Sequence, residues 1–225
     1  MNARPEIPTA WHQTVTGRAI DLLNPDPATI DFTVDVPDAL ARIARFNGGL
    51  HLGPFSVGQH SIHGADALKA QTGRDDIAFA FLLHDGHEYV LGDMTSPVAT
   101  MFVELARKEF NAKTATLIRD LFDLAKAQLD AAIFKAAGVK WPLPEDVTSE
   151  IRIMDVRMLR TERDHLHRRP PMRWHTAVEN ALPVRFPFGS LKIWPWPKVA
   201  DEWRQRFELY RPKPQVRPFL NLKGN

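Results

Sequence analysis

The chain has 225 residues, 44% of them hydrophobic, and its 29 Lys and Arg against 27 Asp and Glu give a net charge of +2. This composition can build a continuous core, and it excludes a disordered or fibrous protein and a polycation suited to non-specific nucleic-acid binding. The absence of cysteine excludes disulfides and thiolate ligands, so any metal must be held by histidine and carboxylate. With no apolar signal segment and no stretch long enough to span a bilayer, we expect a cytoplasmic protein without a membrane partner.

The first part of the chain predicts an irregular arm followed by a helix. Residues 1–34 hold several Pro, Asn and Asp and show little periodicity, which predicts an extended arm with short strands around 19–23 and 30–34. The first helix is predicted to begin at Pro37, whose fixed φ suits a first helical turn, and to end at the Asn-Gly-Gly sequence at 47–49.

A second helix is predicted from Ser56 to about Gly73. Ser56 and Gln59 have the S-x-x-Q spacing of a capping box, in which the two side chains cap each other's backbone donors. His60 therefore falls in the first turns of this helix.

A third helix is predicted over residues 77–90. It opens with seven consecutive apolar residues, and a helix that is apolar all round is a buried helix. His84 and Asp85 are therefore expected in the middle of a buried helix, with Glu88 one turn further along the same side. An ionised carboxylate buried there costs several kcal/mol unless it is paired or coordinates a metal. A divalent cation would serve both side chains, although the dipeptide alone fits equally well a histidine bonded to backbone and an aspartate paired with arginine.

Three further helices are predicted before the chain changes character. Ser96 and Pro97 suit the N-cap and first position of one, and a second runs from Thr114 to Gly138. The third, over 145–166, carries apolar residues at helical spacing, and Asp155 lies beside this stripe, so we expect its carboxylate to face inward. The stripe consists of Val147, Ile151, Met154 and Met158.

The last part of the chain predicts a proline- and tryptophan-rich tail. It has extended pieces and one short helix near 198–209, with too few regularly spaced apolar residues to bury a core of its own. We therefore expect an all-α protein of five or more helices, divided into a core with an N-terminal arm over 1–169 and a C-terminal extension over 170–225 that packs on it.

Histidine and carboxylate side chains from three predicted helices suggest one metal centre. His60, His84, Asp85 and Asp155 together supply two nitrogen and two carboxylate ligands. This donor set admits one divalent ion of manganese, cobalt, zinc, iron or magnesium.

The surrounding strings resemble a known family. GQHS at 58–61, LLHDGHE at 82–88, GDMTSPV at 92–98 and MDVR at 154–157 resemble the H…HD…D signature of the HD-domain phosphohydrolase superfamily. The likeness is to the bacterial 5′-deoxynucleotidases and to the phage enzymes that strip triphosphate from dATP, and it covers roughly residues 16–168.

The resemblance implies a role for each matching residue. His60, His84, Asp85 and Asp155 match the metal ligands, and Arg45, Asp85 and Glu88 match the catalytic set, with Arg45 orienting the phosphate. Phe46 falls where the deoxynucleotidases place a tryptophan that crowds out the ribose 2′-hydroxyl. The implied substrate-binding set is Arg45, Phe46, Asp85, Asp93, Met94, Thr95, Ser96 and Asp155.

Four functions follow from these features. The resemblance favours a metal-dependent 5′-nucleotidase that releases phosphate from (deoxy)nucleoside monophosphates, with a dNTP triphosphohydrolase as its rival. A metal-binding nucleotide sensor without turnover is disfavoured because Arg45 and Glu88 are both present. A nucleic-acid binder that uses the basic stretch 157–173 is disfavoured by the near-neutral net charge. We expect a homodimer or higher homo-oligomer.

Other histidines and the tryptophans allow more ordinary interpretations. His63 could join the site from one turn beyond His60, whereas His87 is expected to turn away by helical phase. His165 and His167 suit a solvated face or a dimer contact. The tryptophans are expected to anchor the tail by packing rather than to stack on bases; they are Trp141, Trp174, Trp194, Trp196 and Trp203.

Overall fold

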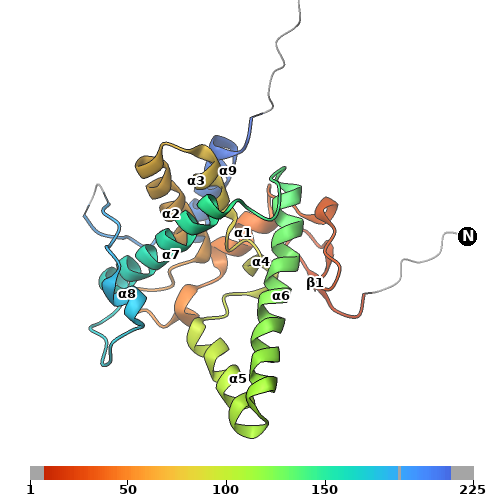
Figure 1. Ribbon diagram of the computed structural model, residues 1–225. Coiled ribbons are helices and arrows are strands. Elements are labelled where there is room, and N and C mark those ends of the chain that lie inside the picture. The colour runs from red at the N-terminus through yellow and green to blue at the C-terminus, as the bar shows by residue number, and fades with distance from the viewer. Residues whose placement is uncertain (1–7, 187–188, 214–225) are drawn as a thin grey trace, which may run out of the picture.

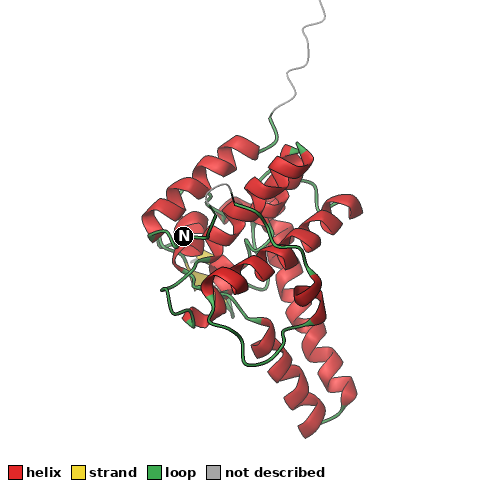
Figure 2. Cartoon of the chain, turned by 90° about the vertical axis from the view of Figure 1, so that its left-hand side faces the viewer, coloured by secondary structure: helices red, strands yellow, loops and turns green. Residues whose placement is uncertain are grey.

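The computed structural model describes residues 8–186 and 189–213, and helices dominate it (Figures 1 and 2). The all-α class is thereby confirmed, with a small antiparallel hairpin of β1 and β2 beside the helices. In chain order the elements are β1 (Trp11–Gln13), β2 (Ala19–Asp21), the 3-10 helix η1 (Pro27–Thr29), α1 (Asp35–Arg42), the 3-10 helix η2 (Arg45–Gly48), α2 (Val57–Thr72), α3 (Asp75–Leu83), α4 (Glu88–Leu91), α5 (Ser96–Glu109), α6 (Ala112–Ala136), α7 (Glu145–Leu166), α8 (Thr176–Asn180) and α9 (Trp196–Tyr210).

The core is centred on α3, which packs against α2, α7 and α9. Its apolar residues 77–83 are all buried, as the sequence predicted. Gly64 of α2 lies directly over Phe81 of α3, and a Cβ at this position would collide with the phenyl ring. A glycine is therefore required for the close approach that brings His60 of α2 and His84 of α3 near each other.

Helices α5 and α6 form a hairpin that projects from the other helices (Figure 1). Val103, Ala106 and Ala115 make up its own small buried cluster. The base of this hairpin lies beside the central helices, so residues at the start of α5 can form one wall of a cavity next to α3 and α4. None of the helices in the described ranges is long and apolar enough to cross a membrane.

The described part of the tail contributes to the same core. Trp203 is completely buried on α9 and stacks with Phe32 and Phe207. Helix α9 is longer than predicted, and α8 was not predicted. The division of the chain at residue 169 stays a prediction, and the predicted tail includes residues 187–188 and 214–225, which lie outside the described ranges.

The prediction that the first helix runs to residue 47 is wrong, because tertiary backbone pairing overrides the local signal. Helix α1 ends at Arg42, and Ile43 is extended. The oxygen of Ile43 accepts a hydrogen bond from the N–H of Val57 at 3.0 Å, and the N–H of Arg45 donates to the oxygen of Phe55 at 2.8 Å. This short pairing fixes the backbone that carries Arg45.

The prediction of a strand over 30–34 is also wrong, whereas β2 lies inside the predicted range 19–23. The carboxylate of Asp31 accepts hydrogen bonds from the N–H groups of Thr33 and Val34. This turn competes with an extended strand and leads directly into α1.

The caps of two predicted helices differ in detail. Ser56 Oγ accepts the N–H of Gln59 at 3.2 Å as predicted, but the Gln59 side chain bonds Lys192 and Trp194 of the tail instead of the Ser56 backbone. Helix α5 begins at Ser96, with Thr95 at the N-cap and no side-chain cap bond, so Ser96 is not the cap. Helix α7 spans the predicted range.

Candidate metal centre

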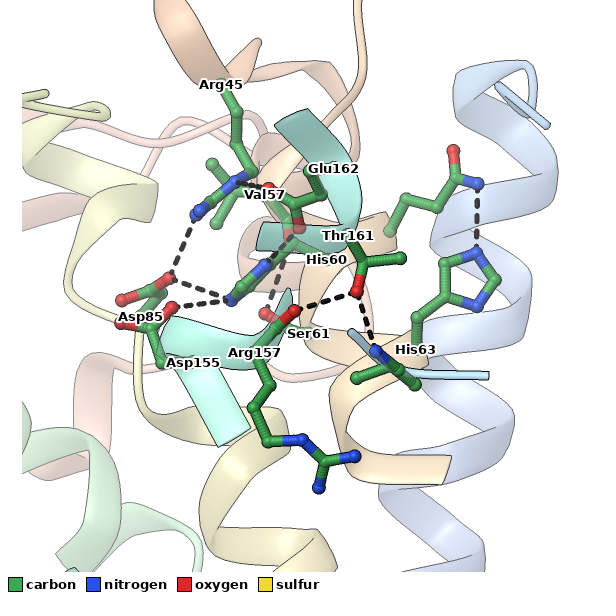
Figure 3. Close-up of polar contacts among 12 residues, drawn as sticks. Arg45, Val57, His60, Ser61, His63, Asp85, Asp155, Arg157, Thr161 and Glu162 are labelled. Carbon is green, nitrogen blue, oxygen red and sulfur yellow. Dashed lines mark hydrogen bonds and ion pairs between the residues drawn. The ribbon is translucent and has the colours of Figure 1, made fainter. Parts of the chain in front are cut away.

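His60 is a completely buried residue in the first turns of α2, between carboxylates of two other segments. Its Nδ1 lies 2.6 Å from Oε1 of Glu162. Its Nε2 lies 3.4 Å from Oδ1 of Asp155 and 3.7 Å from Oδ2 of Asp85. Figure 3 shows the imidazole between Glu162 on one side and the two aspartates on the other.

The His84–Asp85 pair lies at the end of a buried helix, and the prediction that it lies in the middle of one is wrong. Helix α3 ends at Leu83, and the N–H of Gly86 donates to the oxygen of Leu83 at 2.8 Å in a turn that precedes α4. This break lets His84 Nδ1 approach the oxygen of Phe81 at 2.6 Å. Its Nε2 is then 3.2 Å from Oδ2 of Asp85.

The two histidines are held in the same way. Each uses Nδ1 in a short hydrogen bond, to Glu162 for His60 and to the backbone oxygen of Phe81 for His84. The Nε2 atoms of both are buried and have no hydrogen-bond partner of good geometry among the described residues. A histidine whose Nδ1–H is donated presents an Nε2 lone pair, which is how metal-binding histidines are oriented. Two such atoms buried together fit a metal ion.

The carboxylates complete a donor set suited to a divalent cation. His60, His84 and Asp155 each offer one ligand atom, and these atoms lie within 4.8 Å of one another. Asp155 is 44% exposed at its side chain, so its carboxylate borders open space, whereas the Asp85 side chain is 17% exposed. The structure thus brings together the four residues that the sequence predicted as ligands.

Glu162 is a site residue that the sequence analysis missed. Its side chain is fully buried and contacts both His60 and Arg45, with Arg45 Nε at 3.0 Å from Oε2. Arg45 also reaches Asp85, with Nη1 at 3.5 Å from Oδ2. Glu162 lies seven residues, or two helical turns, after Asp155 on α7, and this spacing could have identified it as a member of the same face.

Buried charges set the protonation of the centre in the absence of a metal. Burial and Arg45 act to lower the pKa of His60, but Glu162 and Asp155 outweigh them and raise it to about 9. Burial would raise the pKa of Asp85, but His84, His60 and Arg45 hold it well below its usual range. A cation and a proton therefore compete for Nε2 of His60.

Glu88 differs from Asp85, Asp155 and Glu162, whose pKa values are lowered, because its own pKa is raised in the absence of a metal. Burial, together with the charges of Asp85 and Asp93, raises its pKa to about 9. The side chain is at the start of α4 and its Oε2 is buried. A carboxylic acid held in this form can donate a proton.

A cavity of about 720 Å³ opens over this centre. Every residue of the predicted substrate-binding set lines it, and so does Glu88. Residues from outside that set line it as well. Asn47, Pro97 and Val98 come from η2 and α5, and the others come from α6, α7 and the tail: Lys126, Leu159, His167, Trp174, His175 and Val178.

The remaining histidines lie in several environments. His63 bonds Gln59 at 3.1 Å and packs edge-on against Trp194, away from the aspartates (Figure 3). His87 bonds Asp130 at 2.9 Å. The expectation that His87 turns away from the site is wrong, because the helix breaks and one of its nitrogens lies within 4.8 Å of carboxylate oxygens of Asp85 and Glu88.

His165 and the neighbouring arginines contact the tail. They do not form the solvated face that was one expectation for His165. The Nδ1 of His165 accepts the N–H of Leu191 at 3.1 Å. Arg157 Nε donates to the oxygen of Leu182 at 3.0 Å, and Arg160 Nη1 donates to the oxygen of Glu179 at 2.5 Å. The first arginines of the basic stretch are thus engaged within the protein.

His63 provides a test of burial that is independent of metal binding. Burial lowers its pKa from 6.5 to about 4, although Asp66 and Glu162 act in the opposite direction. The unfolded chain therefore takes up a proton first, so the stability associated with neutral His63 is complete above pH 6.5 and is lost as the pH falls toward 4. Allowing for partial exposure, we expect His63→Gln to remove about 2 kcal/mol of this pH dependence.

Urea unfolding of the native protein and of His63→Gln between pH 4.5 and 7.5 measures this effect. The difference in unfolding free energy between the two proteins should shift in favour of the variant as the pH falls. Parallel pH profiles would show that His63 titrates alike in the folded and unfolded chains.

The fold and the centre define a class of protein: an all-α chain with a cavity lined by Asp85 and Asp155, which lie against the buried His60 and His84 in a cluster that could bind a metal. No family model matches the chain. It is similar to an uncharacterized protein of Rhodobacter capsulatus, with 40% identity over 94 residues that make up 40% of this chain and 46% of that protein. The chain therefore matches about half the length of this curated relative.

Proposed function

We propose that the protein is a metal-dependent phosphohydrolase of the HD type that acts on nucleotides, and specifically a 5′-nucleotidase that cleaves (deoxy)nucleoside monophosphates to nucleoside and phosphate. One observation carries this proposal: two buried Nε2 atoms, which have no hydrogen-bond partner of good geometry among the described residues, face two aspartates that line a cavity together with Arg45. The resemblance of residues 16–168 to the HD superfamily supports the same activity.

The side chains around the cavity suit phosphate ester hydrolysis. A divalent cation held by His60, His84, Asp85 and Asp155 would supply Lewis acidity, both to activate water and to neutralise phosphate charge. Arg45 is fixed by Glu162 through Nε and contacts Asp85 through Nη1, and the other N–H groups of its guanidinium would bind phosphate oxygens by charge-assisted hydrogen bonds. Glu88 lines the same cavity, and burial raises its pKa, so this side chain would serve as the proton donor to the leaving 5′-oxygen.

The charge of the cavity favours a monophosphate over a triphosphate. Among the described residues that line it, Arg45 and Lys126 carry fixed positive charge, whereas Asp85, Asp93 and Asp155 are acidic. With one divalent ion, these two cations and three aspartates sum to about +1, which is closer to the charge of about −2 on a monophosphate than to that of about −4 on a triphosphate. A dNTP triphosphohydrolase is therefore the alternative enzyme. A metal-binding nucleotide sensor without turnover is the alternative that is not an enzyme.

Two further expectations remain predictions. A cytoplasmic location and a homo-oligomeric state both rest on the sequence interpretation. Nucleic-acid binding through the basic stretch stays disfavoured, because Arg157 and Arg160 are used to hold the tail.

A substrate panel tests the proposed function. Protein freed of metal with a chelator and then supplied with Mn²⁺, Co²⁺ or Mg²⁺ should release free phosphate from at least one monophosphate in a set of ribo- and deoxynucleotides. The chelated protein is the control and should be inactive. Chromatography identifies the product: tripolyphosphate would establish the triphosphohydrolase, and nucleotide binding without any product would establish the sensor.

A further inference from the structure

Three aromatic rings gather at the cavity beside Arg45. The ring centroids of Phe46 and His167 are 4.6 Å apart, those of His167 and Trp174 are 5.3 Å apart, and those of Phe46 and Trp174 are 6.3 Å apart. All three residues line the same cavity as the metal centre and are partly exposed there. We call them the aromatic cluster.

Phe46 is held in this cluster by an unusual backbone. Phe46 and Asn47 have φ angles of 57° and 52°, in the left-handed region that residues other than glycine rarely adopt. The N–H of Phe46 donates to Oδ2 of Asp93 at 3.2 Å, which fixes this conformation. Strained residues of this kind gather at functional sites. The strain places the phenyl ring next to the guanidinium group of Arg45, 5.5 Å from the ring centroid.

Trp174 is fixed by a chain of polar contacts to α7. Its backbone N–H donates to Oε1 of Glu179 at 2.9 Å, and Arg163 Nη1 donates to the same oxygen at 2.7 Å. The ring is nevertheless partly exposed toward the cavity, in contrast to the completely buried Trp203. Trp174 therefore packs on its neighbours as expected of an anchor and also presents a surface to the cavity.

His167 adds a polar group to the aromatic cluster. Its Nε2 is buried and has no hydrogen-bond partner within the ranges that the structure describes. Burial lowers the pKa of His167, so the ring is neutral at pH 7 and can donate or accept one hydrogen bond at Nε2.

We propose that Phe46, His167 and Trp174 form the nucleobase subsite of this protein, an inference that rests on the proposed function. A nucleobase is flat, has a π-face that stacks on aromatic side chains, and has a polar edge that hydrogen-bonds a neutral imidazole. In a nucleotide the sugar separates the base from the 5′-phosphate, which agrees with an aromatic cluster next to the phosphate-binding Arg45. The acidic residues of the cavity favour an uncharged base over a second anionic group beside the aromatic cluster.

The assignment gives the tail a role in substrate selection. The resemblance to the HD superfamily covers residues 16–168, and Trp174 lies beyond this range. The central helices then supply the metal ligands and Arg45, and the segment that follows α7 supplies one of the surfaces that select the base.

The test compares a nucleotide with the same phosphate ester lacking a base. For the protein loaded with metal, kcat/KM is measured on the best deoxynucleoside monophosphate of the panel and on 2-deoxyribose 5-phosphate. Trp174→Ala should lower kcat/KM for the nucleotide about tenfold or more, and should leave the value for the sugar phosphate unchanged. Trp174→Phe, which retains a stacking surface, should recover most of the loss.

Trp196→Ala is the matched control, because Trp196 is 44% exposed on α9 and does not line the cavity. It should change neither value. Equal losses on both substrates in Trp174→Ala, or no loss on either, would overturn the nucleobase subsite.

Binding measurements separate this inference from the proposed function. Calorimetric titration with nucleosides, which carry no phosphate, does not depend on hydrolysis. If no phosphate ester is hydrolysed but nucleosides bind and Trp174→Ala abolishes the binding, the proposed function fails and the subsite stands. If nucleotides are hydrolysed but without preference over 2-deoxyribose 5-phosphate, and no nucleoside binds, the subsite fails alone.

Discussion

Replacing Asp85 with asparagine is expected to lower kcat/KM on the best nucleotide about 1,000-fold or more, with the fold retained. A bound cation would stabilise the charge of the transition state by several kcal/mol. Among the proposed ligands, Asp85 contacts both histidines and Arg45. Its Oδ2 lies 3.2 Å from His84 Nε2, 3.7 Å from His60 Nε2 and 3.5 Å from Arg45 Nη1.

Asparagine keeps the volume of Asp85 but loses its charge. We therefore expect two separable losses in Asp85→Asn: weaker binding of Mn²⁺ by calorimetry, and a fall in kcat that persists at saturating Mn²⁺. The second loss follows because the charge that faces Arg45 and the two histidines is gone. Circular dichroism should show an unchanged helical spectrum.

Asp66→Asn is the matched control for this experiment. Asp66 is on α2, the helix that carries His60, and like Asp85 it is ion-paired, but its partners are Arg206 and Tyr210 of α9 rather than the metal centre. The control should bind Mn²⁺ and turn over substrate like the native protein. Activity that is intact in Asp85→Asn would show that the metal centre is wrongly assigned.

The long helices were predictable because their signals are local. Helix α7 spans the range that its apolar stripe predicts, and Asp155 lies near His60 as its place beside that stripe implied. The end of α3 was not predictable in the same way. In an unbroken apolar run, no change of periodicity indicates where a helix ends. The end of α3 is seen only in the structure, where the N–H of Gly86 donates to the oxygen of Leu83.

The aromatic side of the cavity was missed for a different reason. Trp174 lies in a proline-rich segment without periodicity, and the neighbouring sequence does not predict which helix its ring packs on. Its position depends on Glu179 and Arg163, which pair across 16 residues. Contacts of this kind appear only when the chain is folded. By contrast, His60 and Asp155 lie on helices with their own local signals, and His84 and Asp85 directly follow the apolar run of α3.

Removing the side chain of Glu162 is expected to lower the free energy of unfolding by about 3–5 kcal/mol at pH 7, because Glu162→Ala leaves two buried cations without their shared partner. Arg45 is 9% exposed and His60 is completely buried, and both contact this one carboxylate. Burial would raise the pKa of Glu162, but Arg45 and His60 outweigh it and lower that pKa. The stability that the ionised group contributes is therefore present at pH 7 and is lost in acid.

The more conservative Glu162→Gln separates stability from metal binding. Glutamine keeps the volume and one hydrogen bond, so its loss of stability should be smaller than that of alanine. It no longer provides a carboxylate that accepts the Nδ1–H of His60, and partners of this kind affect metal affinity by about 10- to 100-fold. We expect the dissociation constant for Mn²⁺ to rise by about that factor while that for the nucleoside stays the same.

Glu145→Gln serves as the control for both Glu162 variants, since Glu145 is on the same helix with an 84% exposed side chain. Its unfolding free energy in urea should stay within about 0.5 kcal/mol of the native value. If Glu162→Ala proved as stable as the native protein, Arg45 and His60 would not depend on this carboxylate. If Glu162→Gln bound Mn²⁺ like the native protein, the carboxylate of Glu162 would not be needed to orient His60 for metal binding.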